Sequence, residues 1–395
     1  MQSCTTYTIT ITFLVSLAIL PSSIIGYPVR RWTYAENEGD TNYDFGKAFG
    51  IKFNKEINVR LASDKSLEKL VDEFGGGDNA IYIEFLNSHQ IAFPEYMDEL
   101  KGIAEGSGIP FNKLFIDQLK EEFTYFKANQ TESKKELKIM HHCSDVILYQ
   151  PNGKIYMAHN EDSASFDVNG TVLVEAVNGV NGKPGFTTLT YMGNTPTGAF
   201  GFNTEGVVFT MNYLAPLKAD LKGYGRVFIA RKMLDSSGFD DAVNIATKTP
   251  MIAGHNYQIS MINSDKIVNV EVASFGIFKV TEIKAGDPAF FHANKYIQMP
   301  DQPQQLPRTS SDHRMARFKE LEKAKPITTP DEMLMVLGDQ NDRTYPIYHD
   351  DLSNSRGDLG GFTLVSVFVD LQKGEMAVFA QNPKFNNPTF NLTIC

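Results

Sequence analysis

Cys143 is the residue of this chain whose type and position best suit covalent chemistry. It stands directly before an apolar run, Ser144–Tyr149, and directly after two histidines. If the peptide bond between His142 and Cys143 were cut, Cys143 would carry both a thiol and a free α-amine. An α-amine titrates at about 7.7 to 8.0 and a thiol at about 8.5, so the amine can accept the thiol proton near neutral pH. The alternative is a buried or disulfide-bonded cysteine without a chemical role.

The N-terminus predicts that the chain enters the secretory route. Residues 9–20 are mostly apolar, Pro21 and small residues follow, and no charged side chain precedes Arg30. This run is too short to span a bilayer core of about 30 Å, which favours a cleaved signal over a membrane anchor. We therefore expect a signal peptide over residues 1–26, no membrane span elsewhere, and a secreted or lysosomal protein.

Glycosylation sequons and cysteine usage are consistent with this route. Three sequons begin at Asn129, Asn169 and Asn391, and each is an acceptor for N-linked glycan in a secreted protein. The chain has three cysteines, one of which lies in the expected signal. The other two, Cys143 and Cys395, either form a disulfide or leave Cys143 as a working thiol. We expect Cys395, the terminal residue, to be dispensable for the chemistry.

The residue pattern changes from helical to strand-rich at Cys143. Before it, residues 27–142 predict helices that start near Asp64, Pro94 and Leu114, from their capping residues and apolar spacing. After it, the pattern predicts strands over 144–149, 154–159, 171–177, 186–191, 198–202, 207–212, 257–262, 267–273, 278–283, 362–369 and 375–380. It predicts helices over 226–234, 239–247, 313–323 and 331–337. This order indicates an α+β protein with antiparallel sheets sandwiched between helices.

Composition and charge exclude several classes of function. The chain has 395 residues, 42% of them hydrophobic and 21% charged, which is typical of a folded globular protein. Its 37 basic and 47 acidic side chains give a net charge of −10, which argues against nucleic acid as a partner. The adjacent His141 and His142 point to different sides of an extended chain, and no zinc-binding motif is present. We expect neither a metal nor a cofactor.

Blocks of sequence on both sides of Cys143 resemble one enzyme family. The matching blocks, in chain order, are Phe93–Gly106, Cys143–Val146, Pro151–Gly153, Ala158–Asp162, Gly201–Val207, Met211–Tyr213, His292–Asn294 and Leu306–Arg314. Together they resemble the isopenicillin-N acyltransferase family of N-terminal-nucleophile hydrolases, which also includes the insect β-alanyl-dopamine hydrolases. The resemblance implies a four-layer αββα sandwich of two antiparallel sheets, preceded by a mainly helical N-terminal segment.

The resemblance also implies a processed enzyme. Cys143 matches the self-cleaving nucleophile of the family, so a cut between His142 and Cys143 would divide the chain. Residues 27–142 would form a helical small subunit and residues 143–395 the catalytic domain, held together as a two-segment heterodimer. Many family members are cut after a glycine, whereas histidine precedes the nucleophile here.

Further site residues follow from the same resemblance. Asp162 matches an acidic residue that positions the new amine and polar groups of the substrate. This match needs one extra residue after Gly153, and without that insertion Glu161 takes the position. Asn294 matches an oxyanion-hole donor. Asn212 is expected to help position the acyl group or the oxyanion.

A second pair of residues matches the family more loosely. Ser355 and Arg356 resemble a Ser-Arg pair that binds the carboxylate of the substrate in the acyltransferases. The glycines that follow the pair require a gap in the match. The ordinary alternative for these residues, as for the asparagines, is a role in turns and strand ends.

Three functions remain open from the sequence. The first choice is hydrolysis of a linear N-acyl amide, either a ceramidase-like lipid amide or a small acyl-amine. The second is acyl transfer, which differs only in that an amine instead of water attacks the acyl-enzyme. The third is a catalytically silent secreted protein of the same fold that acts by binding. The joint presence of Cys143, Asp162 and Asn294 favours an enzyme.

Overall fold

Two facing sheets form the centre of the molecule. A computed structural model of the chain describes residues 29–35, 40–130, 143–304, 309–352 and 361–394. Within them, one sheet has eight strands in the order β1-β4-β5-β6-β7-β8-β9-β10, and the other has six in the order β11-β2-β3-β12-β13-β14. Every neighbouring pair is antiparallel except β1 and β4, which are parallel.

The strands of the eight-stranded sheet are β1 (Arg30–Tyr34), β4 (Thr171–Ala176), β5 (Phe186–Tyr191), β6 (Phe200–Asn203), β7 (Val207–Leu214), β8 (Gly254–Met261), β9 (Ile267–Val272) and β10 (Phe278–Glu282). Those of the six-stranded sheet are β2 (Ser144–Tyr149), β3 (Ile155–Ala164), β11 (Phe290–His292), β12 (Gly361–Asp370), β13 (Glu375–Phe379) and β14 (Phe390–Thr393). Because side chains alternate along each strand, each sheet has one face toward the other sheet and one face toward helices.

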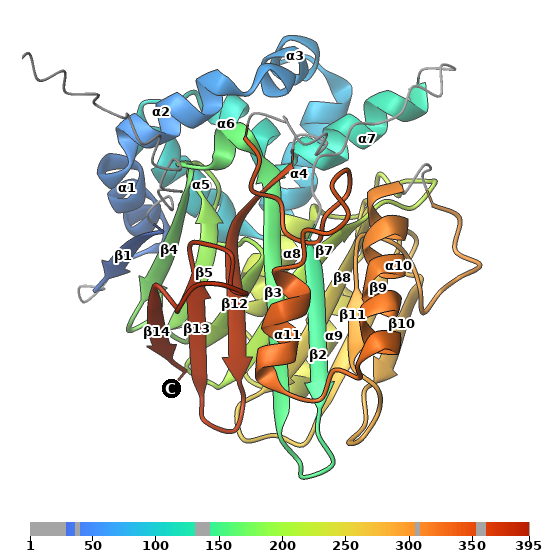
Figure 1. Cartoon of the computed structure of the whole chain (residues 1–395). Helices are drawn as coiled ribbons and strands as arrows, with labels where there is room; N and C mark the ends of the chain where they lie inside the picture. Colours follow the sequence, from blue (N-terminus) through green and yellow to red (C-terminus); the bar gives the residue numbers. More distant parts are fainter. Residues whose placement is uncertain (1–28, 36–39, 131–142, 305–308, 353–360, 395) are drawn as a thin grey trace, which may run out of the picture.

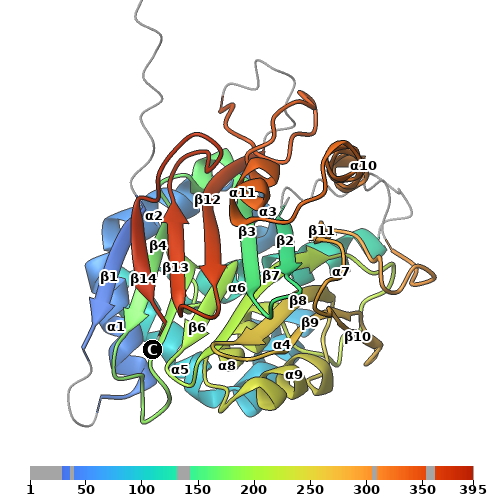
Figure 2. The ribbon, with the colours of Figure 1, turned by 60° about the horizontal axis from the view of Figure 1, so that its bottom comes forward.

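Helices cover the outer face of each sheet. The helices ahead of Cys143 are α1 (Asn42–Lys52), α2 (Asn54–Ser63), α3 (Lys65–Phe74), α4 (Ala80–Ala92), α5 (Pro94–Ser107), α6 (Phe111–Gln118) and α7 (Lys120–Gln130). The later ones are α8 (Arg226–Met233), α9 (Phe239–Lys248), α10 (Thr309–Ala324) and α11 (Pro330–Leu337), with a 3-10 turn over Ser165–Asp167. Figure 2 shows α10 and α11 beyond the six-stranded sheet, and α8 and α9 beyond the eight-stranded sheet.

Three apolar clusters bind these layers together. The first joins the N-terminal helices, α8 and α9 to the eight-stranded sheet through residues such as Phe49, Val174 and Phe228. The second fills the space between the sheets, and the third joins the six-stranded sheet to α10 and α11. The expected four-layer αββα sandwich is therefore confirmed (Figure 1).

The helical N-terminal segment is packed directly onto the sandwich. Helices α1 and α5 cross closely because glycine stands at the contact; a Cβ at Gly46 would lie 2.0 Å from the Glu99 carbonyl oxygen, and one at Gly102 would lie 2.1 Å from that of Tyr43. The segment also contributes β1 to the edge of the eight-stranded sheet, a strand that the sequence pattern did not predict. Burial of this segment against the sheet gives a physical reason for it to stay bound if the chain is cut.

Most elements that the sequence predicted are present, with shifted ends. The predicted strand over 144–149 has those bounds, while the predicted return strand over 154–159 continues to Ala164. The single helix expected near Leu114 is two helices, α6 and α7. In the described part of the chain, no helix has the length and apolar character needed to cross a bilayer. The expected signal peptide, residues 1–26, lies outside the described residues.

Candidate active site

A hairpin places Cys143 at the edge of the space between the sheets. Cys143 directly precedes β2, and its side chain is buried, with a relative exposure of 4%. Strands β2 and β3 are joined by a tight turn at Pro151–Gly153, where Gly153 adopts a positive φ of 87°. The register of this hairpin pairs Asp145 with His159.

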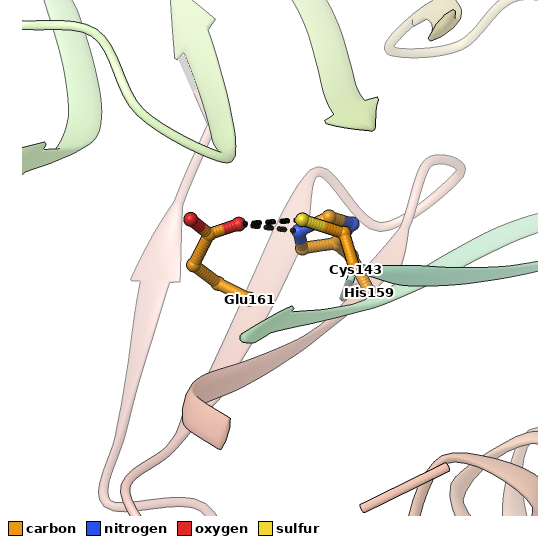
Figure 3. Close-up of side chains that lie close together, drawn as sticks. All are labelled: Cys143, His159 and Glu161. Carbon is orange, nitrogen blue, oxygen red and sulfur yellow. Dashed lines mark hydrogen bonds and ion pairs between the residues drawn. The ribbon is translucent and has the colours of Figure 1, made fainter. Parts of the chain in front are cut away.

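The inner face of the hairpin presents a chain of polar side chains to the thiol. The Cys143 thiol donates a hydrogen bond to Oε2 of Glu161 at 3.2 Å. His159 lies behind Glu161, with Nε2 3.4 Å from the same oxygen and Nδ1 2.9 Å from Oδ1 of Asp145. Tyr191 in β5 donates its hydroxyl to the other Glu161 oxygen. Figure 3 shows Cys143 and His159 both pointing toward the Glu161 carboxylate.

Asp162 lies on the opposite face of β3 from Glu161. Its carboxylate accepts a hydrogen bond from the Thr363 hydroxyl at 2.5 Å, and its other oxygen lies 3.9 Å from Nε2 of His349. Its peptide N–H, not its carboxylate, hydrogen-bonds the sulfur of Cys143. Of the two acidic residues that the sequence left as alternatives, Glu161 is the one whose carboxylate meets the thiol.

Arg314 in α10 connects the nucleophile to Asn294. Its Nη1 donates to the Cys143 carbonyl oxygen at 2.5 Å and to Oγ of Ser144 at 2.8 Å. Its Nη2 donates to Oδ1 of Asn294 at 2.9 Å, and the Asn294 amide donates to the Tyr213 carbonyl oxygen at 3.1 Å. Asn294 is therefore fixed beside the main chain of Cys143, with one amide N–H engaged by protein.

Asn212 belongs to a neighbouring polar cluster between the sheets. It lies in β7, and its Nδ2 is 3.2 Å from Nδ1 of His292. The Nε2 of His292 is in turn 2.9 Å from Oε1 of Glu271. No hydrogen bond of the described residues joins the Asn212 side chain to Cys143.

The remaining predicted residues are two exposed asparagines, one asparagine of α7, and residues outside the described part of the chain. His142, Ser355 and Arg356 are among those not described. Asn169 is exposed in the turn after the 3-10 helix, and Asn391 is exposed on β14. Asn129 lies in α7. The last cysteine, Cys395, is not described.

Burial and neighbouring carboxylates raise the pKa values of both Cys143 and His159, although burial acts in opposite directions on the two groups. Burial raises the pKa of Cys143 well above its ordinary value, and the nearby carboxylates of Glu161 and Asp162 raise it further. Burial alone would lower the pKa of His159, but the carboxylates of Asp145 and Glu161 outweigh it and raise the pKa to about 9. At neutral pH the site therefore holds a protonated thiol and an imidazolium that donates to both carboxylates.

Cys143 and Glu161 both line a cavity at the junction of the helical segment and the sheets. The other walls carry mainly polar side chains, among them Arg60, Asp117, Gln118, Glu121, Asp167, Tyr191, Asn194, Tyr213, Arg226 and His255. The thiol is thus the nucleophilic group at the wall of a polar chamber. Such a chamber, with a nucleophile, an acceptor for its proton and several polar groups, has the properties of an active site.

The cations that line this cavity are held in ion pairs. Arg60 reaches from α2 to Asp117 in α6 at 2.8 Å and to Asp167 at 2.9 Å. Arg226, at the start of α8, pairs with Glu121 in α7. Three of these five ion-paired residues, Arg60, Asp117 and Glu121, belong to the helical segment before Cys143, so that segment completes the cavity.

Four residues of this site were not predicted from the sequence. They are Asp145, His159, Tyr191 and Arg314. The alternation of β3 and the register of its hairpin could have placed His159 and Glu161 on one face with Asp145. Tyr191 and Arg314 come from distant parts of the chain, and no local pattern indicates them.

Several known proteins are similar to this chain. A β-alanyl-dopamine/carcinine hydrolase of Drosophila melanogaster is 25% identical over 378 residues, which cover 90% of this chain and 93% of that protein. Among solved structures, an N-acylethanolamine-hydrolyzing acid amidase ortholog of Caenorhabditis elegans is 14% identical. Its likeness covers 64% of this chain and 100% of that chain, with a TM-score of 0.41. A variant of the conjugated bile acid hydrolase of Clostridium perfringens is 13% identical, covering 64% of this chain and 96% of that chain with a TM-score of 0.39.

The sequence profile of one family matches the greater part of the sandwich. It is described as acyl-coenzyme A:6-aminopenicillanic acid acyl-transferase, and the match runs over residues 148–384, more than half of the chain. The resemblance drawn from the sequence blocks is therefore confirmed, and with it an enzyme that acts on amides. The chain belongs to the acyl-coenzyme A:6-aminopenicillanic acid acyl-transferase family of N-terminal-nucleophile hydrolases.

Proposed function

We propose that the chain is a self-processing cysteine amidohydrolase that is cut before Cys143 and then cleaves small, polar N-acyl amines. The observation that carries this proposal is the contact between the Cys143 thiol and the Glu161 carboxylate at the wall of a polar cavity. A thiol needs a proton acceptor to become a nucleophile. Glu161 can serve before the cut, when Cys143 has no free amine.

The self-cleavage step follows from ordinary acyl chemistry. Glu161 takes the thiol proton, and the sulfur attacks the carbonyl carbon of His142. Glu161 then returns this proton to the nitrogen of Cys143 as the carbon–nitrogen bond breaks, so the nitrogen leaves as an amine and a thioester joins the two segments. Water then hydrolyses the thioester and restores the thiol beside a free α-amine.

Turnover repeats the same chemistry on a substrate amide. The α-amine of Cys143 takes the thiol proton, the sulfur attacks the substrate carbonyl, and Asn294 donates to the oxyanion. The substrate amine leaves with the proton, and water hydrolyses the acyl-enzyme. An acyl transferase would differ only in that a second amine replaces the water.

The cavity supports a small polar substrate over a lipid amide such as ceramide. Its walls carry ion pairs between α2, α6, α7 and α8, and burial of an alkyl chain against such groups would desolvate them without replacement. The Drosophila relative is named for the hydrolysis of β-alanyl-dopamine and carcinine. We therefore propose that this chain hydrolyses amides in which a short acyl group is joined to a polar amine.

The sequence supports a secreted or lysosomal location for this activity. The apolar N-terminus is typical of a cleaved signal, and Asn169 and Asn391 are exposed sequons. The protein from its native host should therefore begin near residue 27 and carry glycans. Cleavage with a peptide N-glycosidase, followed by mass spectrometry, measures both features.

Intact-mass analysis of the purified protein tests the processing. We expect two segments, residues 27–142 and 143–395, of roughly 13 and 28 kDa before glycans, and a single uncut chain for Cys143→Ala. Wild-type protein that stays uncut would refute the self-processing proposal. A disulfide between Cys143 and Cys395 in active material would also refute it.

A substrate panel tests the activity itself. Correctly cut protein would be incubated with β-alanyl amines, N-acyl amino acids, N-acyl ethanolamines and ceramides. We expect turnover of the short polar amides and an acyl adduct on Cys143. Cut protein that forms no adduct with any amide would favour the alternative of a silent binding protein, while turnover of ceramide alone would contradict the polar substrate class.

A further inference from the structure

Three side chains at the nucleophile are arranged like the ligands of a metal ion. The potential ligand atoms of Cys143, His159 and Glu161 all lie within 4.8 Å of one another. All three residues are buried, at 4%, 0% and 4% relative exposure. Thiolate, imidazole and carboxylate are the ligand types that zinc takes in proteins. From this cluster we propose that Cys143, His159 and Glu161 form a zinc-binding site that holds the nucleophile inactive.

The spacing of the three atoms suits zinc without rearrangement of the backbone. Tetrahedral bonds of about 2.3 Å to sulfur and about 2.0 Å to nitrogen and oxygen place neighbouring ligands roughly 3.3 to 3.5 Å apart. The sulfur of Cys143 lies 3.2 Å from Oε2 of Glu161, and Nε2 of His159 lies 3.4 Å from the same oxygen. The third pair, the sulfur and Nε2, lies within 4.8 Å, and rotation of these two side chains about Oε2 of Glu161 would bring both atoms to the ion.

The residues around the three ligands have the contacts that support a metal site. Nδ1 of His159 donates to Asp145 at 2.9 Å, which orients Nε2 toward the other ligands. A carboxylate on the far nitrogen of a metal-binding histidine is a common supporting contact. Tyr191 holds the second oxygen of Glu161, so one carboxylate oxygen remains for the ion. The cavity lined by Cys143 and Glu161 gives an entry path and room for water as fourth ligand.

Binding exchanges protons for the metal and involves no change of oxidation state. Zinc replaces the proton of the Cys143 thiol and the proton on Nε2 of His159, and both protons leave to solvent. Oε2 of Glu161 loses its hydrogen bonds from Cys143 and His159 and binds the ion instead. With its sulfur bonded to zinc, Cys143 cannot attack a carbonyl, so both self-cleavage and turnover would stop until the metal is removed. Magnesium and calcium prefer oxygen ligands and would not compete.

Metal titration of the full chain tests this site without any substrate. Protein freed of metal by a chelator and dialysis would be titrated with zinc chloride by calorimetry, and with cobalt(II) to detect the absorption band of a thiolate–cobalt bond. We expect one zinc per chain, a thiolate–cobalt band, and no binding of magnesium. Substitutions Cys143→Ala and His159→Gln should each lower zinc affinity at least 100-fold and abolish or weaken the band, and Asp145→Asn should lower it about 10- to 100-fold.

The adjacent Asp162 offers a matched control. Asp162→Asn removes a carboxylate next to Glu161 in sequence but on the other face of β3, so zinc affinity should be retained. Circular dichroism of each variant tests whether it is folded. If a variant is unfolded, Glu161→Gln takes its place, because glutamine keeps the shape of the glutamate side chain. Equal zinc affinity in wild type and Cys143→Ala, or no binding by folded wild type, would overturn the proposal.

The outcome is separable from that of the proposed function. The inference uses the same thiol, but the titration does not depend on amide turnover or on the cut before Cys143. Zinc binding in a protein without amide turnover would leave the metal site standing. Turnover that is unaffected by stoichiometric zinc would refute the inhibitory site alone.

Discussion

The two faces of strand β3 are built for different tasks, although their residues alternate along one sequence. The inner face carries His159 and Glu161, which connect Asp145 to the Cys143 thiol. The outer face carries Asn160, whose amide donates to the Leu337 and Ile347 carbonyl oxygens at 2.9 and 3.0 Å. One face thus provides groups that can exchange protons with the nucleophile, and the other holds the loop after α11 against the sheet.

The contrast is sharpest between Glu161 and Asp162, which are neighbours in sequence. Glu161 accepts from the thiol, from His159 and from Tyr191. Asp162 accepts from Thr363, and burial raises the pKa of its carboxyl to about 6, with His349 acting in the opposite direction. Two acidic residues that are adjacent in a strand can therefore differ fully in their chemistry, because a shift of one residue reverses the face of the sheet.

Substitution of the two acids in parallel gives the largest expected difference. Glu161→Gln removes the proton acceptor of the uncut thiol, so we expect self-cleavage to slow by about 10²- to 10⁴-fold. Asp162→Asn should slow it far less, because its peptide N–H and not its carboxylate contacts the sulfur. The rate of conversion of full-length precursor to two segments, followed by gel and intact mass, measures both. A larger loss in Asp162→Asn would reverse our assignment of the two faces.

Substitution of Asn294 tests whether the hydrogen bonds of Arg314 to Asn294 and Cys143 serve catalysis as well as stability. In Asn294→Ala we expect turnover by cut protein to fall about 10²- to 10³-fold, since an oxyanion donor is lost. KM should change little, because the ground-state carbonyl gains less from that donor. Steady-state kinetics on matured protein separate the two constants. If kcat is retained while the free energy of unfolding falls, Asn294 only supports Arg314.

The raised pKa of Asp162 predicts how the outer face responds to pH. The folded pKa of about 6 exceeds the unfolded value of about 3.9, so the folded state binds the proton more tightly between these pH values. Its contribution to stability is present below about pH 4 and is lost as the pH rises to about 6, by up to about 3 kcal/mol.

Asp162→Asn places a neutral amide at this position, so the loss of stability between about pH 4 and about pH 6 should disappear. Urea unfolding at pH 4, 5, 6 and 7 would measure the stability difference between the variant and wild type. We expect the variant to gain on wild type as the pH rises through this window. A difference that does not vary with pH would mean that the Asp162 carboxyl titrates normally.

Among the substitutions on the inner face, that of Tyr191 should change the rate of self-cleavage least. Tyr191→Phe removes one hydrogen bond to Glu161, which keeps its contacts to the thiol and to His159. The net value of one such bond is about 1 kcal/mol, so self-cleavage should slow about fivefold. The precursor assay used for Glu161 measures it. A loss as large as that of Glu161→Gln would show that Tyr191 itself takes part in the proton transfer.

Much of the fold could be predicted because its signals are local. The helix α3 begins after Asp64, whose side chain accepts from the N–H groups of Ser66 and Leu67, and α5 begins at Pro94. The first hairpin has a turn with a glycine of positive φ. By contrast, β1 was missed because its five residues are half-exposed and their pairing partner, β4, is far away in the sequence.

For the site, the sequence by itself determined which cysteine is the candidate nucleophile and which two acidic residues lie in the strand beside it. Cys143 before a strand, and the run from Ala158 to Asp162 in the returning strand, are local facts that place these residues side by side. Only the tertiary structure decided that Glu161 rather than Asp162 meets the thiol, and that Tyr191 and Arg314 complete the site. The reason is physical, since the burial of β3 between a second sheet and a helix layer selects which side chains face inward, and contacts between distant segments carry no local signal.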